Sequence, residues 1–365
     1  MKAEKRSHPL VPGEPAPWFS CRTSTRERYV FDTVAGRYIV LSFLGAAGDP
    51  HARALLEGVR STRERFDDQS FAFFGVTTGE AGEADALLQD AIPGLRFFRD
   101  DEREVSELYG VVAPDGSYRG LTYVLDPSLR VIASLPFNEG HFERLDALLG
   151  RLPPLPAPEI ARPQAPVLVL PHVFEPALCR DLIDYYERLG GRESGFMREV
   201  DGITRLQHDH GHKRRRDRDI EDEDLRRACM RRIHDRLAPE IEKAYQFRAT
   251  RMERYLVSCY DAQEDGHFRP HRDNTTKGTA HRRFAVSLFL NGGEYEGGYL
   301  RFPEFGPALY TAPTGGAVVF GCSMLHEATR VTRGKRYMFL PFLYDDAAAR
   351  VRKENLKYLE LDSGT

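Results

Sequence analysis

Cysteine is scarce in this sequence of 365 residues, which has five thiols that lie far apart and form no Cys-x-x-Cys pair. Without closely spaced cysteines, neither a disulfide framework nor a zinc site built on thiolates is expected. We therefore predict that Cys21, Cys179, Cys229, Cys259 and Cys322 are reduced thiols, most of them buried.

Long apolar runs and a strong charge bias are also missing. The first 19 residues have no apolar core of a signal peptide, and the longest apolar runs, YIVLSFL and FAFFGV, have the length of strands. A net charge of -3 with 29% charged residues weighs against nucleic-acid or membrane partners. We expect a cytoplasmic globular protein, long enough for two domains.

The N-terminal part alternates between strand and helix patterns, which predicts a small α/β domain with a central sheet. A hairpin is expected at 121–136, where Asp126-Pro127 begins the turn, followed by an amphipathic helix from His141. The other expected strands are 36–44 and 71–78, and the other expected helices are 51–67 and 83–91.

Proline density marks a boundary between domains. Six of the sixteen residues from 151 to 166 are proline, which favours an extended spacer over a packed element. We expect a first domain at 1–150, a linker at 151–166, a second domain at 167–350 and a C-terminal tail at 351–365.

The second domain changes from helices to strands at Arg251. Before that point, apolar side chains spaced four apart form one helical stripe that we expect to be core, with Pro239 kinking or interrupting the helix. The stripe consists of Leu225, Cys229, Ile233, Leu237, Ile241 and Tyr245. After Arg251, short strands follow one another without helices, which predicts an antiparallel sandwich or barrel.

A His-x-Asp pair lies in these strands, at His271 and Asp273. In an extended strand the two side chains share one face, with Cα atoms roughly 6–7 Å apart. Two imidazoles and one carboxylate on one side of an octahedral metal leave three positions open, as in non-haem Fe(II) oxygenases. His326 is the candidate third ligand, 55 residues after His271.

Arg336 follows His326 by ten residues, in the apolar strand RYMFLPF. An arginine there is suited to hold a carboxylate through two charge-assisted hydrogen bonds, although most arginines of this chain are expected to be solvated.

A second histidine group, His208, His210 and His212, could chelate a divalent ion from one strand face, but it has no partner with a defined second shell. The adjacent basic run 213–216 is followed by the acidic residues 221–224. We expect this run to be a solvated loop, with a lid over the active site as the alternative.

The segment from 165 to 346 resembles the prolyl 4-hydroxylase-type branch of the Fe(II)/2-oxoglutarate dioxygenases. The likeness rests on His271-x-Asp273, GGYLRFPE (297–304), PTGGAVVF and the spacing from His326 to Arg336. It implies a double-stranded β-helix (jelly roll) with supporting helices, in which His271, Asp273 and His326 bind Fe(II). Arg336 would bind 2-oxoglutarate, O2 would be the oxidant, and ascorbate is a candidate accessory reductant.

Three further positions bear on the co-substrate. Tyr260 matches a tyrosine that relatives place near 2-oxoglutarate. Phe289 stands where relatives often have a second tyrosine, whose neutral hydrogen bond would be worth only about 0.5–1.5 kcal/mol. Ser287 shares that strand face and could take over its role.

Residues 10–150 resemble the thioredoxin-like peroxiredoxin (AhpC/TSA) fold through APWF, YIVLSFLGAAGDPHA, YGV and the TYVLD strand. In active relatives a nucleophilic cysteine begins the helix after the first core strand, but this chain has GDPHAR there. We therefore expect a non-catalytic domain for binding or homodimerisation.

Taken together, the residues and the resemblance favour a hydroxylase that acts on a prolyl or other side chain of a protein or peptide. A small amino-acid-like or natural-product metabolite is the alternative substrate. A thiol peroxidase is disfavoured because the required cysteine is missing, and a silent binding protein is disfavoured because the four residues of the metal and co-substrate site are intact.

Overall fold

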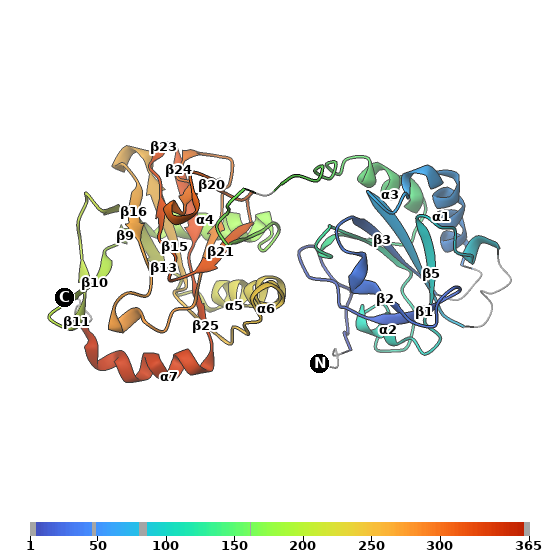
Figure 1. Cartoon of the computed structure of the whole chain (residues 1–365), viewed down its shortest axis with the longest axis horizontal. Helices are drawn as coiled ribbons and strands as arrows, with labels where there is room; N and C mark the ends of the chain where they lie inside the picture. The colour runs from blue at the N-terminus through green and yellow to red at the C-terminus, as the bar shows by residue number, and fades with distance from the viewer. Residues whose placement is uncertain (1–4, 46–48, 80–85, 161, 361–365) are drawn as a thin grey trace. The chain divides into compact units, whose positions relative to one another are not determined.

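The computed structural model of the chain describes residues 5–45, 49–79, 86–160 and 162–360, which divide into two compact units, 1–159 and 160–365 (Figure 1). The division falls inside the proline-rich segment. At one end of this segment, the Pro153 carbonyl accepts a hydrogen bond from Tyr38 of the first unit. At the other end, Pro166 accepts one from Tyr245 of the second unit.

The first unit is built on one seven-stranded sheet with the order β2-β1-β5-β4-β3-β6-β7. Its strands are β1 (Ser20–Thr23), β2 (Tyr29–Val30), β3 (Tyr38–Gly45), β4 (Phe71–Thr77), β5 (Leu95–Arg99), β6 (Leu121–Leu125) and β7 (Val131–Pro136). Its helices are α1 (Pro50–Ser61), α2 (Glu104–Leu108) and α3 (His141–Leu149). Strands β3, β4 and β5 are parallel, whereas β6 and β7 form the predicted antiparallel hairpin.

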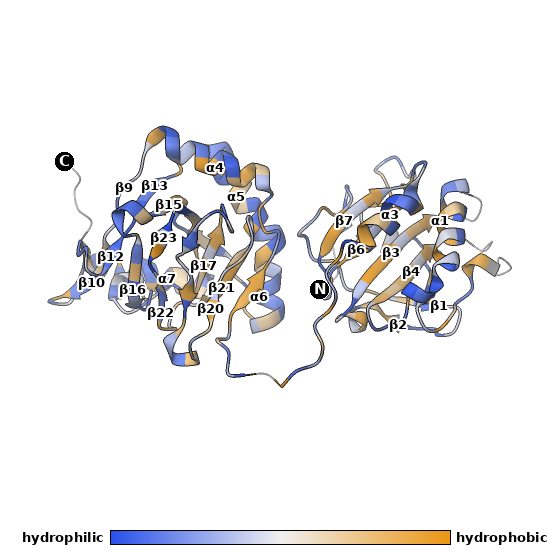
Figure 2. Ribbon diagram, turned by 90° about the horizontal axis from the view of Figure 1, so that it is seen from above, coloured by the Kyte–Doolittle hydropathy of each residue, from blue (hydrophilic) through white to orange (hydrophobic). Residues whose placement is uncertain are grey.

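Both faces of this sheet are covered, which is why β3 is buried along its whole length. Ile39, Leu41 and Phe43 belong to one apolar core, and Val40 and Leu44 belong to the other, which includes side chains of α1 and α3. Figure 2 shows β3 and β4 in the orange of apolar residues. The predicted α/β fold is therefore confirmed, and β1, β2 and β5 are additional strands.

One predicted helix of this unit differs. Of the segment 83–91, residues 83–85 lie outside the described part of the chain, and the described remainder contains only the 3-10 turn Ala86–Leu88.

The second unit contains a five-stranded and a nine-stranded β-sheet besides two smaller sheets, which confirms the predicted jelly-roll class. One sheet has the order β12-β16-β22-β19-β20, and the other has the order β14-β25-β17-β24-β15-β13-β9, with β21 paired to β17 and to β8. The strands before Arg251 are β8 (Leu168–Leu170), β9 (Arg192–Glu193), β10 (Phe196–Val200), β11 (Ile203–Gln207), β12 (Lys213–Arg214) and β13 (Arg216–Asp219).

The later strands are β14 (Arg251–Glu253), β15 (Leu256–Asp261), β16 (His267–His271), β17 (Phe284–Phe289), β18 (Glu296–Gly297), β19 (Leu300–Arg301), β20 (Leu309–Tyr310), β21 (Ala317–Gly321), β22 (His326–Ala328), β23 (Val331–Arg333), β24 (Lys335–Phe339), β25 (Phe342–Tyr344) and β26 (Leu359–Glu360). One apolar cluster joins Phe268 and Leu300 of the first sheet to Phe289 and Met338 of the second. The two sheets therefore share a core.

Helices α4 (Pro176–Leu189), α5 (Glu223–Arg232), α6 (Ala238–Tyr245) and α7 (Asp346–Asn355) complete this unit. The predicted stripe is core: Cys229, Ile233, Leu237 and Ile241 are buried in one cluster. The interruption expected at Pro239 takes the form of a π-helical segment, Ile233–Leu237, between α5 and α6. Pro239 lies in the first turn of α6, where its missing N–H is least costly.

Two expectations for this unit are wrong. The basic run 213–216 is not a solvated loop, because it forms β12 and the start of β13, and Lys213 and Arg215 are buried. The C-terminal tail expected from 351 is, over residues 351–360, part of the second unit, because α7 extends to Asn355 and β26 pairs with β11. No helix within the described ranges is long and apolar enough to cross a membrane.

Gly315 anchors the start of α4 to the sheet. Its carbonyl accepts the N–H groups of Val173 and Phe174, and its φ is +77°. A Cβ on Gly315 would lie 2.1 Å from the Phe174 carbonyl oxygen, whereas a Cβ on Gly293, at φ +88°, would meet nothing within 4 Å.

We predict that Gly315→Ala destabilises the second unit more than Gly293→Ala does. Both substitutions incur the left-handed backbone cost of about 1–2 kcal/mol, and only the first adds a backbone clash of about 1–3 kcal/mol. Differential scanning calorimetry of the full chain measures the difference. Equal transition temperatures for the two variants would contradict this role of Gly315.

Candidate active site

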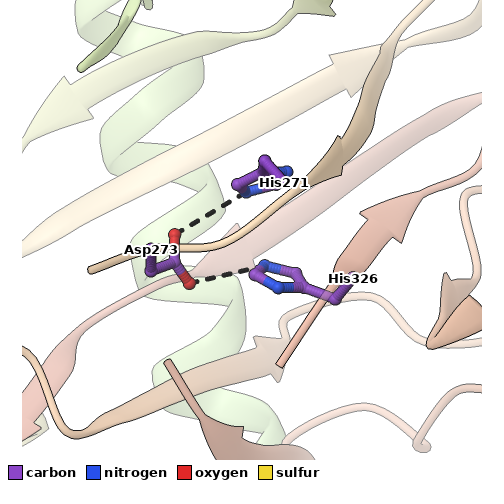
Figure 3. Close-up of side chains that lie close together, drawn as sticks. All are labelled: His271, Asp273 and His326. Atoms are coloured by element: carbon purple, nitrogen blue, oxygen red, sulfur yellow. Dashed lines mark ion pairs between the residues drawn. The ribbon is translucent and has the colours of Figure 1, made fainter. Parts of the chain in front are cut away.

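The antiparallel pairing of β16 with β22 places His271 directly opposite His326. A β-bulge between Phe268 and His271 resets the alternation of side chains, so that both rings face the same cavity. Asp273 lies two residues beyond His271, where its backbone N–H donates to the Cys322 carbonyl. Figure 3 shows the side chains of His271 and Asp273 and that of the distant His326 pointing toward one another.

The three side chains are close enough to bind one ion. Their candidate ligand atoms lie within 4.8 Å of one another. The two Asp273 oxygens face different imidazoles, at 3.6 Å from His271 Nε2 and 3.4 Å from His326 Nε2. The His271–Asp273–His326 group is the one metal-binding arrangement of this kind in the described part of the chain.

Backbone carbonyls orient both imidazoles. His271 Nδ1 lies 2.8 Å from the Arg269 oxygen, and His326 Nδ1 lies 3.0 Å from the Met324 oxygen. A carbonyl can only accept, so each Nδ1 carries the proton and each Nε2 keeps a lone pair for a metal.

The ionisation of the site also suits a metal. Burial, and next the nearby His271, lower the pKa of His326 to about 4, so this imidazole is neutral at pH 7. Burial alone would raise the pKa of Asp273, but in acid the protonated imidazoles of His326 and His271 outweigh burial and hold that pKa below its usual range. A neutral imidazole and an ionised carboxylate are the forms that bind a divalent cation.

All six residues predicted for the site line one cavity of about 720 Å³: His271, Asp273, His326, Arg336, Tyr260 and Ser287. Arg336 is 1% exposed, and its Nε and Nη2 have no hydrogen-bond partner among the described residues. Leaving such a buried group unpaired costs about 1–3 kcal/mol or more. An anion in the cavity would remove that cost.

Aromatic rings hold the Arg336 guanidinium from two sides. Its carbon lies 4.9 Å from the Tyr260 ring centre and 5.3 Å from that of Phe289. Tyr260 faces Arg336 across the β15–β24 ladder, and its hydroxyl accepts a hydrogen bond from Arg215 at 3.2 Å. Ser287 is buried on β17, in the wall of the same cavity.

Sequence reasoning missed several cavity residues, including Lys213, Arg215 and Arg254. The sequence KRRRDRD could have indicated two of them, because alternate side chains of an extended chain share one face, which groups Lys213 and Arg215 with Asp217.

The other histidine group does not form a comparable site. His208 and His210 both approach the exposed Glu193, whereas the His212 ring packs between those of Phe196 and Phe268.

The first unit lacks an activated thiol. Burial, and next Asp100, raise the pKa of Cys21 to about 11, and its thiol donates to the Arg99 carbonyl. No other cysteine lies before Cys179. At the N-terminus of α1, the Asp49 carboxylate accepts the N–H groups of His51 and Ala52, so an acidic side chain caps the helix there.

The donor set fits Fe(II) and 2-oxoglutarate. Two imidazoles and a carboxylate suit Fe(II) with open coordination positions. The buried, unsatisfied Arg336 in the same cavity suits the free carboxylate of a bound dicarboxylate.

Comparisons with known proteins agree with this chemistry. Residues 255–344 match the model of the 2OG-Fe(II) oxygenase superfamily, and residues 12–134 match that of the AhpC/TSA family. No curated protein matches the chain.

Solved structures resemble each part of the chain. A prolyl hydroxylase from Trichoplax adhaerens, in complex with a hypoxia inducible factor peptide fragment, is 13% identical and covers 52% of this chain and 87% of its own, with a TM-score of 0.41. A prolyl-4-hydroxylase from Pseudomonas putida is 18% identical, and the match covers 50% of this chain and 94% of the hydroxylase, with a TM-score of 0.38. AhpC of Mycobacterium tuberculosis is 15% identical, and the match covers 39% of this chain and 95% of AhpC, with a TM-score of 0.33.

The two matched family models confirm both resemblances. The chain therefore combines a segment similar to the 2OG-Fe(II) oxygenase superfamily, at 255–344, with a segment similar to the AhpC/TSA family, at 12–134.

Proposed function

We propose that the second unit hydroxylates an unactivated C–H bond at the expense of 2-oxoglutarate and O2. The observation that carries this proposal is the presence, in one cavity, of two imidazoles, a carboxylate and a buried arginine with unsatisfied N–H groups. The balanced reaction converts 2-oxoglutarate, O2 and R–H to succinate, CO2 and R–OH.

Each side chain has a proposed role in this reaction. His271, Asp273 and His326 would hold Fe(II), which together with 2-oxoglutarate and O2 supplies the oxidant for the C–H bond. Arg336 would bind the far carboxylate of 2-oxoglutarate through its free N–H groups. Tyr260 orients Arg336 through its ring, and Ser287 would donate a hydrogen bond to the co-substrate where Phe289 cannot.

We propose two classes of substrate. We favour a prolyl or other side chain of a protein or peptide, and we keep a small amino-acid-like or natural-product metabolite as the alternative. We also propose ascorbate as an accessory reductant.

For the first unit, we propose a non-catalytic role in binding or homodimerisation. The raised pKa of the Cys21 thiol and the Asp49 cap at the start of α1 disfavour peroxidase chemistry.

Replacing Arg336 tests the proposed activity. Arg336→Gln removes charge-assisted hydrogen bonds worth about 1.5–3 kcal/mol, so we expect the KM for 2-oxoglutarate to rise roughly 10- to 100-fold. The measurement is Fe(II)-dependent succinate formation at varied 2-oxoglutarate. Arg330→Gln, at an exposed position on the loop before β23, is the control with unchanged KM. No succinate from the wild type, or equal KM values for the two variants, would contradict the assignment.

Gly298 supports the same arginine. Its φ is +62°, and a Cβ there would lie 2.6 Å from Arg336 Cδ and 2.9 Å from Val331 Cγ2. Overpacking costs about 1–3 kcal/mol, so Gly298→Ala should displace Arg336 and raise the KM for 2-oxoglutarate roughly fivefold or more.

Gly293→Ala is the matched control, because its backbone is also left-handed and nothing lies within 4 Å of the added methyl group. Equal effects of the two substitutions would show that the Gly298 contact does not position Arg336.

A further inference from the structure

A second set of positive charges lies in the cavity, apart from Arg336. Lys213, Arg215 and Arg254 line the wall, with Asp217 bonded to two of them, and we call these four residues the cationic cluster. The segment that supplies most of it crosses between the sheets, because β12 pairs with β16 and β13 pairs with β15. Lys213 and Arg215 are buried on the cavity side of this segment, whereas Arg214 and Arg216 are exposed.

Asp217 is the one carboxylate of this cluster, and its two oxygens accept four hydrogen bonds. They accept from Ser194 Oγ, Arg215 Nη2 and Ser258 Oγ at 2.5, 2.6 and 2.7 Å, and from Arg254 Nη2 at 3.3 Å. One negative charge therefore serves two guanidinium groups. Two other arginines of the wall have separate partners, since Arg282 pairs with Glu253 and Arg272 pairs with Glu304.

Lys213 has no such partner, because no described carboxylate lies within 4.0 Å of its Nζ. Its ammonium donates to Ser194 Oγ and to the Gly195 carbonyl, and it lies 4.9 Å from the Phe268 ring centre. Burial, and next the charge of Arg215, hold the pKa of Lys213 well below its usual value. A bound anion would offset both effects and favour the ammonium form.

The two carboxylates of 2-oxoglutarate do not neutralise the positive charge of the cationic cluster. One carboxylate of 2-oxoglutarate would balance Arg336, and the other would balance the charge that remains on Fe(II) after Asp273. With Lys213 protonated, the cationic cluster keeps three positive charges against the single negative charge of Asp217. Buried charges without counter-charges are costly, so a further anion would stabilise the cluster with Lys213 protonated.

The cluster is also near the reacting centre. Lys213 lies opposite Phe268 in the β12–β16 ladder, and the Phe268 ring stacks on that of His271 with centroids 3.5 Å apart. One aromatic side chain therefore separates the ammonium from a candidate metal ligand. Arg254 has a φ of +66°, a backbone conformation that is costly for a residue other than glycine.

We propose that the substrate carries a carboxylate that binds to Lys213 and Arg254, close to the C–H bond that is oxidised. This proposal rests on the proposed oxygenase function and narrows its substrate to acidic compounds: a peptide with Asp or Glu beside the reacting residue, or a small carboxylic acid.

Affinity selection tests the proposal without turnover. The full-length protein is loaded with Mn(II) and 2-oxoglutarate, and it is offered a pool of acetylated proline-centred pentapeptide amides or a pool of N-acetyl amino acid amides, so that only Asp and Glu side chains carry a carboxylate. We expect roughly tenfold enrichment of members with Asp or Glu over those with Asn or Gln, as for a charge-assisted contact. The pool that shows the enrichment identifies the source of the carboxylate.

Charge-removing variants locate the contact. Lys213→Met and Arg254→Gln should each abolish most of the enrichment, whereas Arg214→Gln, which removes an exposed charge from the same segment, should keep it. The affinity for 2-oxoglutarate and the melting temperature are measured in parallel, because a folding defect would change them and loss of the substrate contact would not.

Two failures are distinguishable in this design. Equal retention of acidic and amide members, or retention of neither, by protein that binds 2-oxoglutarate overturns the acidic-substrate proposal. Loss of 2-oxoglutarate binding in the wild type itself overturns the proposed function instead.

Discussion

The site depends on one constraint, the register of the antiparallel pair β16–β22. This register puts His271 opposite His326 although 55 residues separate them in the chain. A shift of one residue would turn one imidazole to the opposite face of its sheet, so that only two of the three candidate metal ligands would remain together. The bulge before His271 and the Asp273 N–H bond to Cys322 adjust the remaining geometry locally.

Positive charge dominates the rest of the cavity. Arg336 is buried with unsatisfied N–H groups, and Arg215 and Arg254 of the cationic cluster share one carboxylate. Such groups destabilise a protein unless anions reach them, so their presence is better explained by ligands than by stability. Two cationic regions, which meet at Tyr260, lie beside one metal-binding triad and are consistent with two anionic ligands, a co-substrate and a substrate.

Much of this organisation was predictable from the sequence. Strand and helix periodicity predicted an α/β domain and an antiparallel sandwich or barrel, and the family resemblances implied the thioredoxin-like and jelly-roll folds. All six predicted site residues line one cavity. The basic segment was misjudged because its charges were assumed to be solvated and neutralised by the acidic residues 221–224. In the structure, Arg215 instead pairs with Asp217, two residues away on the same strand face, and Arg216 pairs with Glu264 from another strand connection. Which sheet a strand joins is a tertiary property, and alternation alone shows only which side chains share a face.

The central claim is that His271, Asp273 and His326 bind Fe(II) so that 2-oxoglutarate can chelate it. The most direct test is anaerobic addition of Fe(II) and 2-oxoglutarate, followed by visible absorption spectroscopy. The account predicts a weak charge-transfer band that needs both additions and is absent from folded His271→Ala protein. The absence of this band from the folded wild-type protein, or an unchanged band in the variant, would contradict it.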